Sequence, residues 1–191
     1  MRSVDEILDV LKEHDALKTG HFVLASGKHS GHYFQVAMLT QHPRVLQDLI
    51  RSPLDSWAGN VAVVLSAAVG GIPVGQQVAL HVGCRSIFAE RNEKNRMILK
   101  RSFAIQPGEK ILMVEDVITT GGTLDELNPL VEEHGGEIVG VFTVVNRSGK
   151  STWNQLPIAS VVACEFPVYD PADCPLCREG VPAHRPGTKK V

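Results

Sequence analysis

The stretch that decides the fold is Ile111-Leu-Met-Val-Glu-Asp-Val-Ile-Thr-Thr-Gly-Gly-Thr123. Its first four residues are apolar and predict a short buried strand of a parallel sheet. Glu115 and Asp116 follow at the carboxyl end of this strand, where open α/β sheets form their ligand crevice. Two acids in that position can accept hydrogen bonds from vicinal hydroxyl groups or lie near a metal-bound polyphosphate.

The turn after the acids is rich in hydroxyl groups and glycine, and it consists of Thr119, Thr120, Gly121, Gly122 and Thr123. Glycine permits positive φ angles, which point successive backbone N–H groups into one concavity. A helix that begins at about Thr123 adds the positive end of its dipole. The turn is therefore predicted to bind a phosphate group.

The sequence after this turn supports a ligand-binding role. Leu124, Leu127, Leu130 and Val131 share one face of a helix that ends at a Gly-Gly pair, and residues 138–145 predict another strand. Pro129 is expected to kink this helix or to mark a late start. The alternative is a strand with a glycine-rich helix cap and no ligand, but strand, turn, helix and strand make the βαβ unit that such a ligand site requires.

Residues 114–123 resemble the phosphoribosyl-pyrophosphate (PRPP) motif of type I phosphoribosyltransferases over its whole length. The resemblance implies an α/β fold with a central, mostly parallel sheet flanked by helices and a small hood subdomain. Residues 1–191 are expected to form one such domain. The hood is expected mainly from residues 1–40, with a contribution from the 160–191 tail.

The bulk composition fits one globular domain. Of the 191 residues, 43% are hydrophobic, which is enough for a sizeable core. The formal net charge of −2 lacks the excess of positive charge that is typical of nucleic-acid-binding domains. Acidic residues interrupt the amphipathic amino-terminal helix, so the chain is expected to lack a signal or transit peptide. No apolar run approaches the length of a membrane span. We therefore expect a cytoplasmic protein with neither nucleic acid nor membrane as partner.

Residues 20–34 alternate apolar and polar side chains around a Ser-Gly turn, which predicts a hairpin. This segment resembles the amino-terminal signature of orotate phosphoribosyltransferases, a Phe-x-Leu-x-Ser-Gly turn before a Tyr/Phe-Phe pair. The alternative is an ordinary hairpin whose aromatic side chains pack in the core. The resemblance implies that five residues surround the base, orotate: Ser26, Tyr33, Phe34, Thr119 and Arg147.

Arg147 follows the strand predicted after the βαβ helix. A guanidinium group can bind a carboxylate through two parallel hydrogen bonds, and orotate carries a carboxylate. A surface arginine at a strand end is the alternative.

A second glycine-rich turn follows the apolar strand predicted at residues 61–65 and can form another anion nest. In the family the corresponding loop contacts pyrophosphate, which implicates the backbone of Ala68, Val69 and Gly70, with Gly71 beside them. Many family members carry a lysine here and another before the Ser-Gly turn, where this chain has Gly70 and Ala25. Other cations must then neutralise pyrophosphate.

The basic segment at residues 90–101 could supply those cations. It matches the family's flexible catalytic loop in position and length, so the resemblance assigns Lys94 as the catalytic lysine and Arg91 and Arg96 as its basic neighbours. A solvated charged hairpin is the alternative. The family often has lysine and histidine at the two arginine positions and arginine at the position of Glu90.

Four cysteines are too few for a disulfide scaffold in a chain of this size. Cys174 and Cys177 form a CxxC pair, which has the spacing of zinc ligands, although reduced structural thiols have the same spacing. Zinc would need two further ligands, for which the candidates are Cys84, Cys164 and His184. His29 and His32 are expected to be surface polar groups.

The resemblance implies an enzyme of pyrimidine (UMP) biosynthesis that converts orotate and PRPP to orotidine 5′-monophosphate and pyrophosphate. Glu115 and Asp116 would hold the ribose, and the implied cofactor is Mg²⁺, bound through PRPP with Asp116 as a candidate ligand. A homodimer with the basic loop shared between subunits is also implied. Two alternatives remain: a transferase for a purine or another base, and a non-catalytic regulator that binds PRPP on the same fold.

Overall fold

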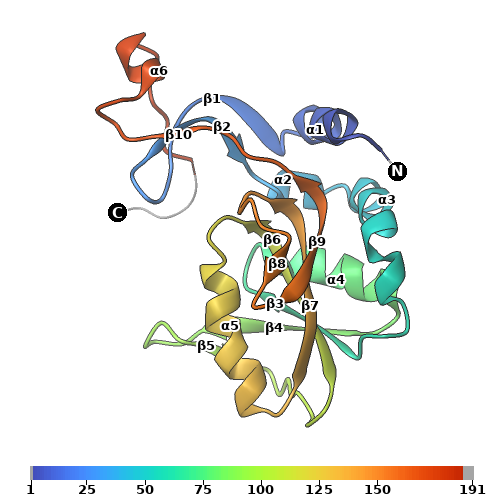
Figure 1. The fold of residues 1–191 in the computed structure, drawn as a ribbon. Coiled ribbons are helices and arrows are strands. Elements are labelled where there is room, and N and C mark those ends of the chain that lie inside the picture. Colours follow the sequence, from blue (N-terminus) through green and yellow to red (C-terminus); the bar gives the residue numbers. More distant parts are fainter. Residues whose placement is uncertain (1, 187–191) are drawn as a thin grey trace.

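The computed structural model describes residues 2–186. A seven-stranded sheet forms the body of the molecule (Figure 1). Its strands follow one another across the sheet in the order β5 (Met97–Leu99), β4 (Arg85–Arg91), β3 (Val63–Ala67), β6 (Lys110–Ile118), β7 (Glu137–Asn146), β9 (Leu156–Ala163) and β8 (Thr152–Trp153). The pairs from β4 to β9 are parallel, and the edge strands β5 and β8 are antiparallel to their neighbours. The predicted mostly parallel α/β sheet is confirmed.

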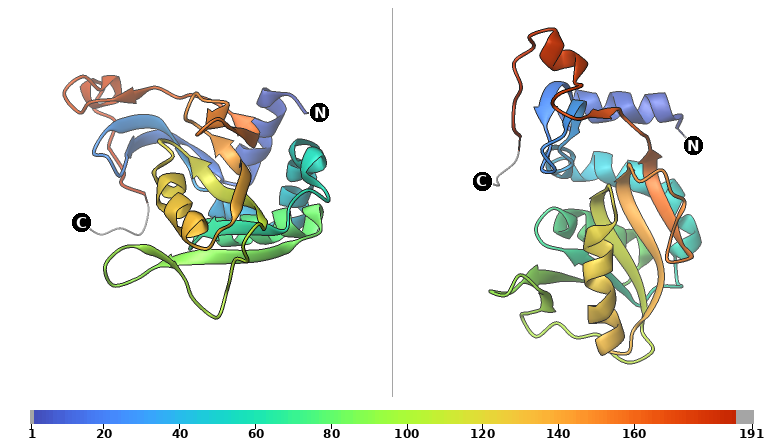
Figure 2. Two further views of the ribbon diagram at one scale, coloured as in Figure 1. Left: turned by 60° about the horizontal axis from the view of Figure 1, so that its bottom comes forward. Right: turned by 60° about the vertical axis from the view of Figure 1, so that its left-hand side comes forward.

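Helices cover both faces of this sheet (Figure 2). On one face α3 (Pro43–Leu54) and α4 (Gly71–Val82) pack together and against the strands, and α5 (Gly122–Glu133) covers the other face. Side chains alternate along β3: Val64 belongs to the core under α3 and α4, whereas Val63 and Leu65 belong to the core under α5. Successive side chains of the strand thus point to opposite faces of the sheet, and both faces are buried, as the continuous apolar sequence of the strand predicts.

A second, three-stranded sheet lies above the body, with its strands in the order β1 (Leu17–Val23), β2 (His29–Phe34) and β10 (Val168–Tyr169). We call this sheet, together with α6 (Pro175–Arg178), the hood. The predicted hairpin is β1 and β2, and the tail adds the third strand. The remaining elements are α1 (Val4–Glu13), α2 (Ala37–Thr40) and a 3₁₀ turn at Asp55–Trp57.

Local details follow from the sequence with two changes. The strand expected at residues 61–65 is β3 and begins two residues later, at Val63. The helix α5 begins at Gly122 and continues through Pro129, so a late helix start is wrong. No helix in residues 2–186 is long and apolar enough to cross a membrane.

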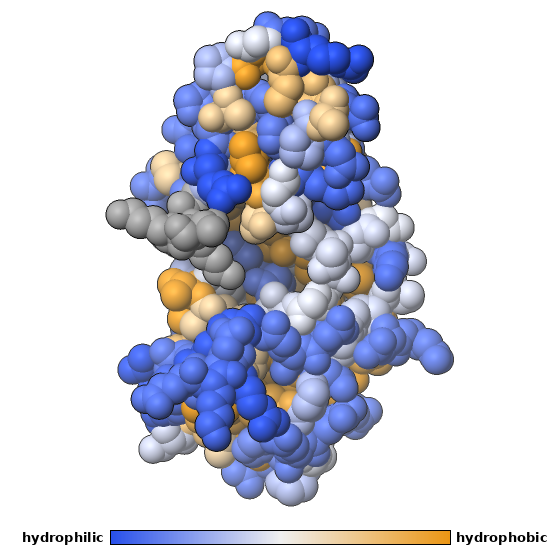
Figure 3. Space-filling model, turned by 90° about the vertical axis from the view of Figure 1, so that its left-hand side faces the viewer, coloured by the Kyte–Doolittle hydropathy of each residue, from blue (hydrophilic) through white to orange (hydrophobic). Residues whose placement is uncertain are grey.

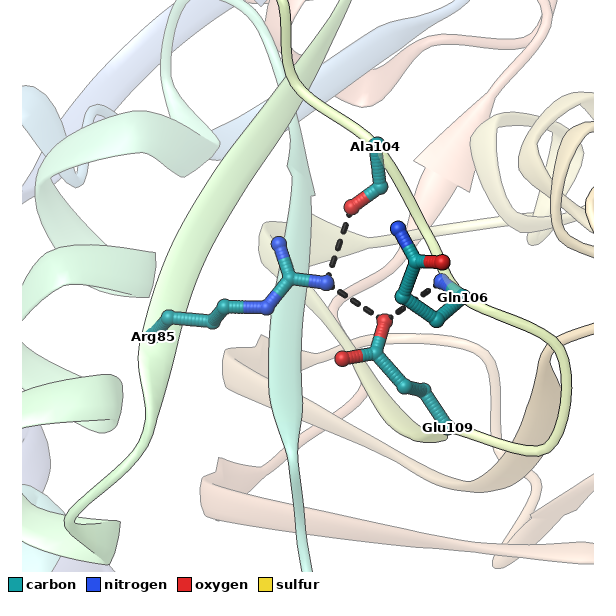
Figure 4. A network of polar contacts seen from close by, with 4 residues as sticks. All are labelled: Arg85, Ala104, Gln106 and Glu109. Carbon is teal, nitrogen blue, oxygen red and sulfur yellow. Dashed lines mark hydrogen bonds and ion pairs between the residues drawn. The ribbon is translucent and has the colours of Figure 1, made fainter.

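A network of hydrogen bonds joins the start of β4 to the segment between β5 and β6 (Figure 4). The guanidinium group of Arg85, the first residue of β4, donates to the carbonyl oxygen of Ala104 at 2.8 Å and to the carboxylate of Glu109. The same carboxylate accepts from the backbone N–H of Gln106 at 2.7 Å. The network therefore anchors the connection from β5 to β6, so that β6 enters the sheet in a fixed register.

Candidate functional site

The acid pair lies inside β6, beyond the point where this strand leaves β3. Pairing between β3 and β6 ends at Val114, whereas pairing between β6 and β7 continues to Ile118. The strand is therefore longer than the predicted residues 111–114. Glu115 and Asp116 have β7 on one side and the turn after β3 on the other, and this edge forms the crevice of the sheet.

Glu115 is held in an environment that disfavours its charge. Burial raises the pKa of its carboxyl group to about 8, and the neighbouring charge of Asp116 adds to the effect. Its Oε2 atom is buried and has no hydrogen-bond partner among the described residues. By contrast, Asp116 accepts a hydrogen bond from the backbone N–H of Val117 at 2.9 Å. An incoming hydroxyl group or cation would satisfy the buried oxygen of Glu115.

The threonine- and glycine-rich turn forms a small cavity next to this acid. The cavity has a volume of about 220 Å³ and includes Glu115, all five predicted phosphate-binding residues and Glu126 in its lining; the five are Thr119, Thr120, Gly121, Gly122 and Thr123. Gly121 has a φ of 90° and precedes the first turn of α5. Because a left-handed φ favours glycine, this residue lets the chain reverse and present N–H groups of the helix start to a ligand.

The second glycine-rich turn joins the same site through Gly70. It connects β3 to α4, and Ala68 donates its backbone N–H to the carbonyl oxygen of Ala89 at 2.8 Å. The Val69 side chain is 78% exposed, and the peptide bond between Ala68 and Val69 is cis. A Cβ atom on Gly70 would lie 2.6 Å from Oδ2 of Asp116. Glycine at this position therefore lets the turn approach the acid pair closely.

A larger cavity of about 550 Å³ lies between the hood and the end of the sheet, and it includes Asp116 in its lining. The space-filling view shows the molecule hollowed between its upper and lower parts (Figure 3). All five residues that the resemblance assigns to the base line this cavity: Ser26, Tyr33, Phe34, Thr119 and Arg147. This one cavity thus brings together the hairpin turn, two aromatic side chains, the threonine turn and the residue after β7.

Arg147 is half-buried in this larger cavity. Its guanidinium carbon lies 5.7 Å from the centre of the Phe34 ring, a cation–π distance. The Nε atom is buried and has no hydrogen-bond partner among the described residues, and burial lowers the pKa of the side chain. Burial also raises the pKa of Tyr33, and the charge of Asp116 adds to this shift. The cavity therefore offers an unpaired cation beside flat apolar surfaces.

The tail supplies lining residues that sequence reasoning missed, namely Glu165, Phe166 and Val168. Phe166 stacks on His32 with ring centres 4.0 Å apart, and Val168 pairs with Ser30 in the hood sheet. Their only signal in the sequence is an apolar-polar alternation too short to read as a strand. Burial and the charge of Arg147 lower the pKa of His32, which favours a neutral ring in this stack.

The basic segment forms a hairpin instead of an open loop. Asn95 has a φ of 59°, and the side-chain oxygen of Asn92 accepts from the backbone N–H of Lys94 at 2.9 Å and of Arg96 at 3.0 Å. Arg91 forms an ion pair with Glu126 of α5 at 2.6 Å. Lys94 and Arg96 are exposed and line neither of the two cavities described above. Within the described residues of one chain, Lys94 and Arg96 do not reach the cavities of the acid pair, whereas Arg91 pairs with Glu126, which lines the smaller one.

The acid pair has the chemistry of a magnesium site. Mg²⁺ takes oxygen ligands, usually one or two carboxylates together with phosphate oxygens of the substrate. Asp116 lines the larger cavity, and Glu115, whose Oε2 has no hydrogen-bond partner among the described residues, lines the smaller one. These residues fit a magnesium ion carried by a polyphosphate ligand.

Comparison with known proteins identifies the class. The family model of the phosphoribosyl transferase domain matches residues 35–165, which include β3, the acid pair and the threonine turn. The chain belongs to the phosphoribosyltransferase family. It is 43% identical over 188 residues to the orotate phosphoribosyltransferase of Desulforamulus reducens, with 98% of each chain covered. It is 41% identical over 186 residues to the orotate phosphoribosyltransferase of Thermotoga maritima, with 96% of this chain and 98% of the relative covered.

Solved structures agree on the fold. The crystal structure of orotate phosphoribosyltransferase from Aeropyrum pernix superposes with a TM-score of 0.69 at 21% identity, covering 82% of this chain and 93% of the other. An adenine phosphoribosyltransferase from Rhodothermus marinus superposes with a TM-score of 0.64 at 22% identity, covering 84% and 99%. Because enzymes for different bases share the fold at this level of identity, these structures show the fold and do not identify the base.

Proposed function

We propose that the chain transfers a phosphoribosyl group from PRPP to orotate, giving orotidine 5′-monophosphate and pyrophosphate, a step of pyrimidine biosynthesis. One observation carries the choice of substrate: the buried, unpartnered Nε of Arg147 in a cavity walled by Tyr33 and Phe34. A flat, anionic pyrimidine carboxylate satisfies both features. The relatives that match almost the whole chain are named orotate phosphoribosyltransferases, which supports the same substrate.

The two cavities divide the substrates between them. In the proposed arrangement the 5′-phosphate occupies the threonine turn, the ribose hydroxyl groups meet Glu115 and Asp116, and orotate lies against the hood. The bond between the ribose carbon and the pyrophosphate oxygen breaks, and a ring nitrogen of orotate bonds to that carbon and releases its proton. Positive charge develops on the ribose during this exchange, so nearby carboxylates favour the transition state.

Bound magnesium would neutralise charge on the pyrophosphate leaving group. Asp116 and Glu115 are the residues that would hold it near the ribose. The backbone of Ala68, Val69 and Gly70 is proposed to contact the pyrophosphate, because Gly70 lies next to the Asp116 carboxylate. The chain itself orients both substrates, and the hood excludes water that would otherwise hydrolyse the activated sugar.

We propose Lys94, flanked by Arg91 and Arg96, as the cation that meets the leaving pyrophosphate. The hairpin that carries them, between β4 and β5, extends sideways from the body below the hood in Figure 1. A homodimer in which each subunit's hairpin reaches the partner's site is therefore proposed, since the exposed residues are absent from both cavities of their own chain. The cytoplasmic location also stays a prediction.

A spectrophotometric assay tests the function directly. With PRPP and magnesium, the purified chain should consume orotate, and the panel should include adenine, hypoxanthine and uracil. Turnover of a purine without turnover of orotate would favour a transferase for another base. Binding of ribose 5-phosphate or PRPP with no turnover of any base would favour the regulator.

A further inference from the structure

Four metal-binding side chains meet in the hood, far from the acid pair in sequence. They are His21 on β1, His29 on β2, and Cys174 and Cys177 of the tail, and their ligand atoms all lie within 4.8 Å of one another. His21, His29 and Cys174 are buried, and Cys177 is exposed. The expectation that His29 is a surface group is therefore wrong. Cys84, Cys164 and His184, the candidates for the two further ligands, are not part of the cluster.

The spacing of the ligand atoms resembles a tetrahedral zinc site. With Zn–S bonds of about 2.3 Å and Zn–N bonds of about 2.0–2.1 Å, a tetrahedron places sulfur about 3.6 Å from nitrogen and the two nitrogens about 3.3 Å apart. The Nε2 atom of His21 lies 3.6 Å from Sγ of Cys174 and 3.7 Å from Sγ of Cys177. The Nδ1 atom of His29 lies 3.3 Å from Sγ of Cys177 and 2.8 Å from Nε2 of His21. The two ring nitrogens would have to move apart by about half an ångström to reach the tetrahedral spacing, and all four ligand atoms already lie within 4.8 Å of one another.

A hydrogen bond from Nδ1 of His21 to a backbone carbonyl oxygen leaves the other ring nitrogen, Nε2, available to bind a metal. Nδ1 of this ring lies 2.7 Å from the carbonyl oxygen of Val181. A carbonyl oxygen only accepts, so Nδ1 carries the proton and the lone pair of Nε2 points toward the cysteines. Metal-binding histidines commonly donate their second nitrogen to a backbone carbonyl in this way, which fixes the ring orientation.

The fold brings the two histidines together by the register of the hairpin. Val23 pairs directly with His29, and His21 lies two residues before Val23, so the two histidine side chains are diagonal neighbours on one face. The register shifts between Thr19 and Phe22, and such a bulge changes the direction of nearby side chains. Cys174 is the N-cap residue of α6 and Cys177 lies in its single turn, and this short segment brings both sulfur atoms to the histidines.

The tail needs such an anchor because it has almost no core. Among residues 163–186, Cys174 alone is buried. The helix α6 has four residues, far fewer than a helix needs to be stable by itself. Yet the chain beyond α6 returns to β1, where His184 exchanges backbone hydrogen bonds of 2.8 Å with His21 and Val23. Small units without sufficient apolar burial are commonly held by a structural metal.

From this geometry we propose that the hood binds one structural zinc ion through His21, His29, Cys174 and Cys177. Two thiolates and two imidazoles in a closed tetrahedral set favour zinc, and four protein ligands leave no position for a substrate. Binding releases the two thiol protons, and the proton between the histidine rings moves from Nδ1 of His29 to Nε2 of the same ring, so that both rings bind as neutral imidazoles. The zinc fixes the tail on the hairpin and thereby positions Phe166 and Val168, which line the larger cavity.

Metal content tests the proposal without reference to catalysis. The full chain, purified under reducing conditions without a histidine tag, should contain about one zinc per chain by elemental analysis. Cys177→Ser and His29→Asn should each reduce the zinc content to about a tenth or less. Cys84→Ser is the matched control and should retain zinc. Equal zinc in the ligand variants and in Cys84→Ser, or a folded wild-type chain that takes up no zinc, would overturn the site.

Two measurements on the wild-type chain decide the matter if a ligand variant fails to fold. Replacement of zinc by Co²⁺ should give the intense visible bands of tetrahedral cobalt and a thiolate charge-transfer band, saturating at about one equivalent. Chelation should accelerate trypsin cleavage after Arg178 in α6, because the tail loses its anchor. An octahedral cobalt spectrum without charge transfer, or an unchanged rate of cleavage, would refute the proposal.

Discussion

Replacing Gly70 by alanine would place a methyl group in the space occupied by the Asp116 carboxylate. The added Cβ atom would lie 2.6 Å from Oδ2, 3.0 Å from Cγ and 3.4 Å from Oδ1 of this residue. Ordinary contact begins at about 3.4 Å, so the carboxylate must move by about 0.8 Å. Asp116 cannot turn freely, because its Oδ1 accepts the backbone N–H of Val117.

The expected effect is on binding and catalysis and not on folding. Gly70 has a φ of −62°, which alanine adopts without strain, so the free energy of unfolding should be unchanged or rise by up to about 1 kcal/mol. A displacement of about 1 Å in a substrate-positioning group can cost about 100-fold in rate. We therefore expect Gly70→Ala to lower kcat/KM for PRPP by about 10- to 100-fold, which corresponds to about 1.4–2.8 kcal/mol.

A double-mutant cycle identifies the cause. Steady-state assays and calorimetric titration with PRPP and magnesium should be run on Gly70→Ala, Asp116→Ala and the double variant, with thermal unfolding as the folding control. If alanine acts by displacing the carboxylate, it should add little once the carboxylate is gone. The reasoning fails if Gly70→Ala binds and turns over PRPP normally, or if its penalty is equally large in the Asp116→Ala background.

Four further predictions concern single side chains. Arg147→Ala should raise KM for orotate much more than KM for PRPP, and equal effects would make this arginine structural. Lys94→Ala should lower kcat by about 100- to 1000-fold with a smaller change in PRPP affinity, whereas full activity would exclude a catalytic role. Thr120→Val should weaken ribose 5-phosphate binding in calorimetry, and unchanged affinity would remove this hydroxyl from the phosphate site. In the metal-free protein, the pKa of Glu115 is raised to about 8, so the folded state keeps a proton that the unfolded state releases between pH 4.5 and 8. The free energy of unfolding should therefore fall as pH rises through this range. In thermal unfolding, Glu115→Gln should abolish this fall, and the surface control Glu133→Gln should not.

Most of the body could be predicted from local patterns. The run at residues 111–123 combines a buried strand, a left-handed glycine and a helix start, and each of these has a local physical cause. The predicted end of β6, at residue 114, is four residues too early, because two acidic residues in a row are uncommon in a strand. Their place in the strand depends on pairing with β7, which is a tertiary contact.

The hood was harder to predict because its parts are distant in sequence. The pairing of Val168 with Ser30 and the meeting of His21 with Cys174 join segments more than 130 residues apart. No periodicity within either segment encodes such a contact. The basic segment forms the charged hairpin that was the alternative to a flexible loop, with its turn held by the side chain of Asn92. The ion pair of Arg91 with Glu126 on α5 is a tertiary contact that the segment alone does not encode.

The larger cavity is built from two parts that are held together in different ways. On one side, Asp116 belongs to β6, a central strand that pairs with both β3 and β7 between two buried cores. On the other, Tyr33 and Phe166 belong to the hood and the weakly buried tail. Native-state hydrogen exchange distinguishes such parts, since amides of a central strand exchange by global unfolding and those of a lightly packed sheet by local opening. Amides of β1 and β2 are therefore expected to exchange faster than those of β6, which would show that the hood side of the larger cavity opens locally while the sheet side stays folded.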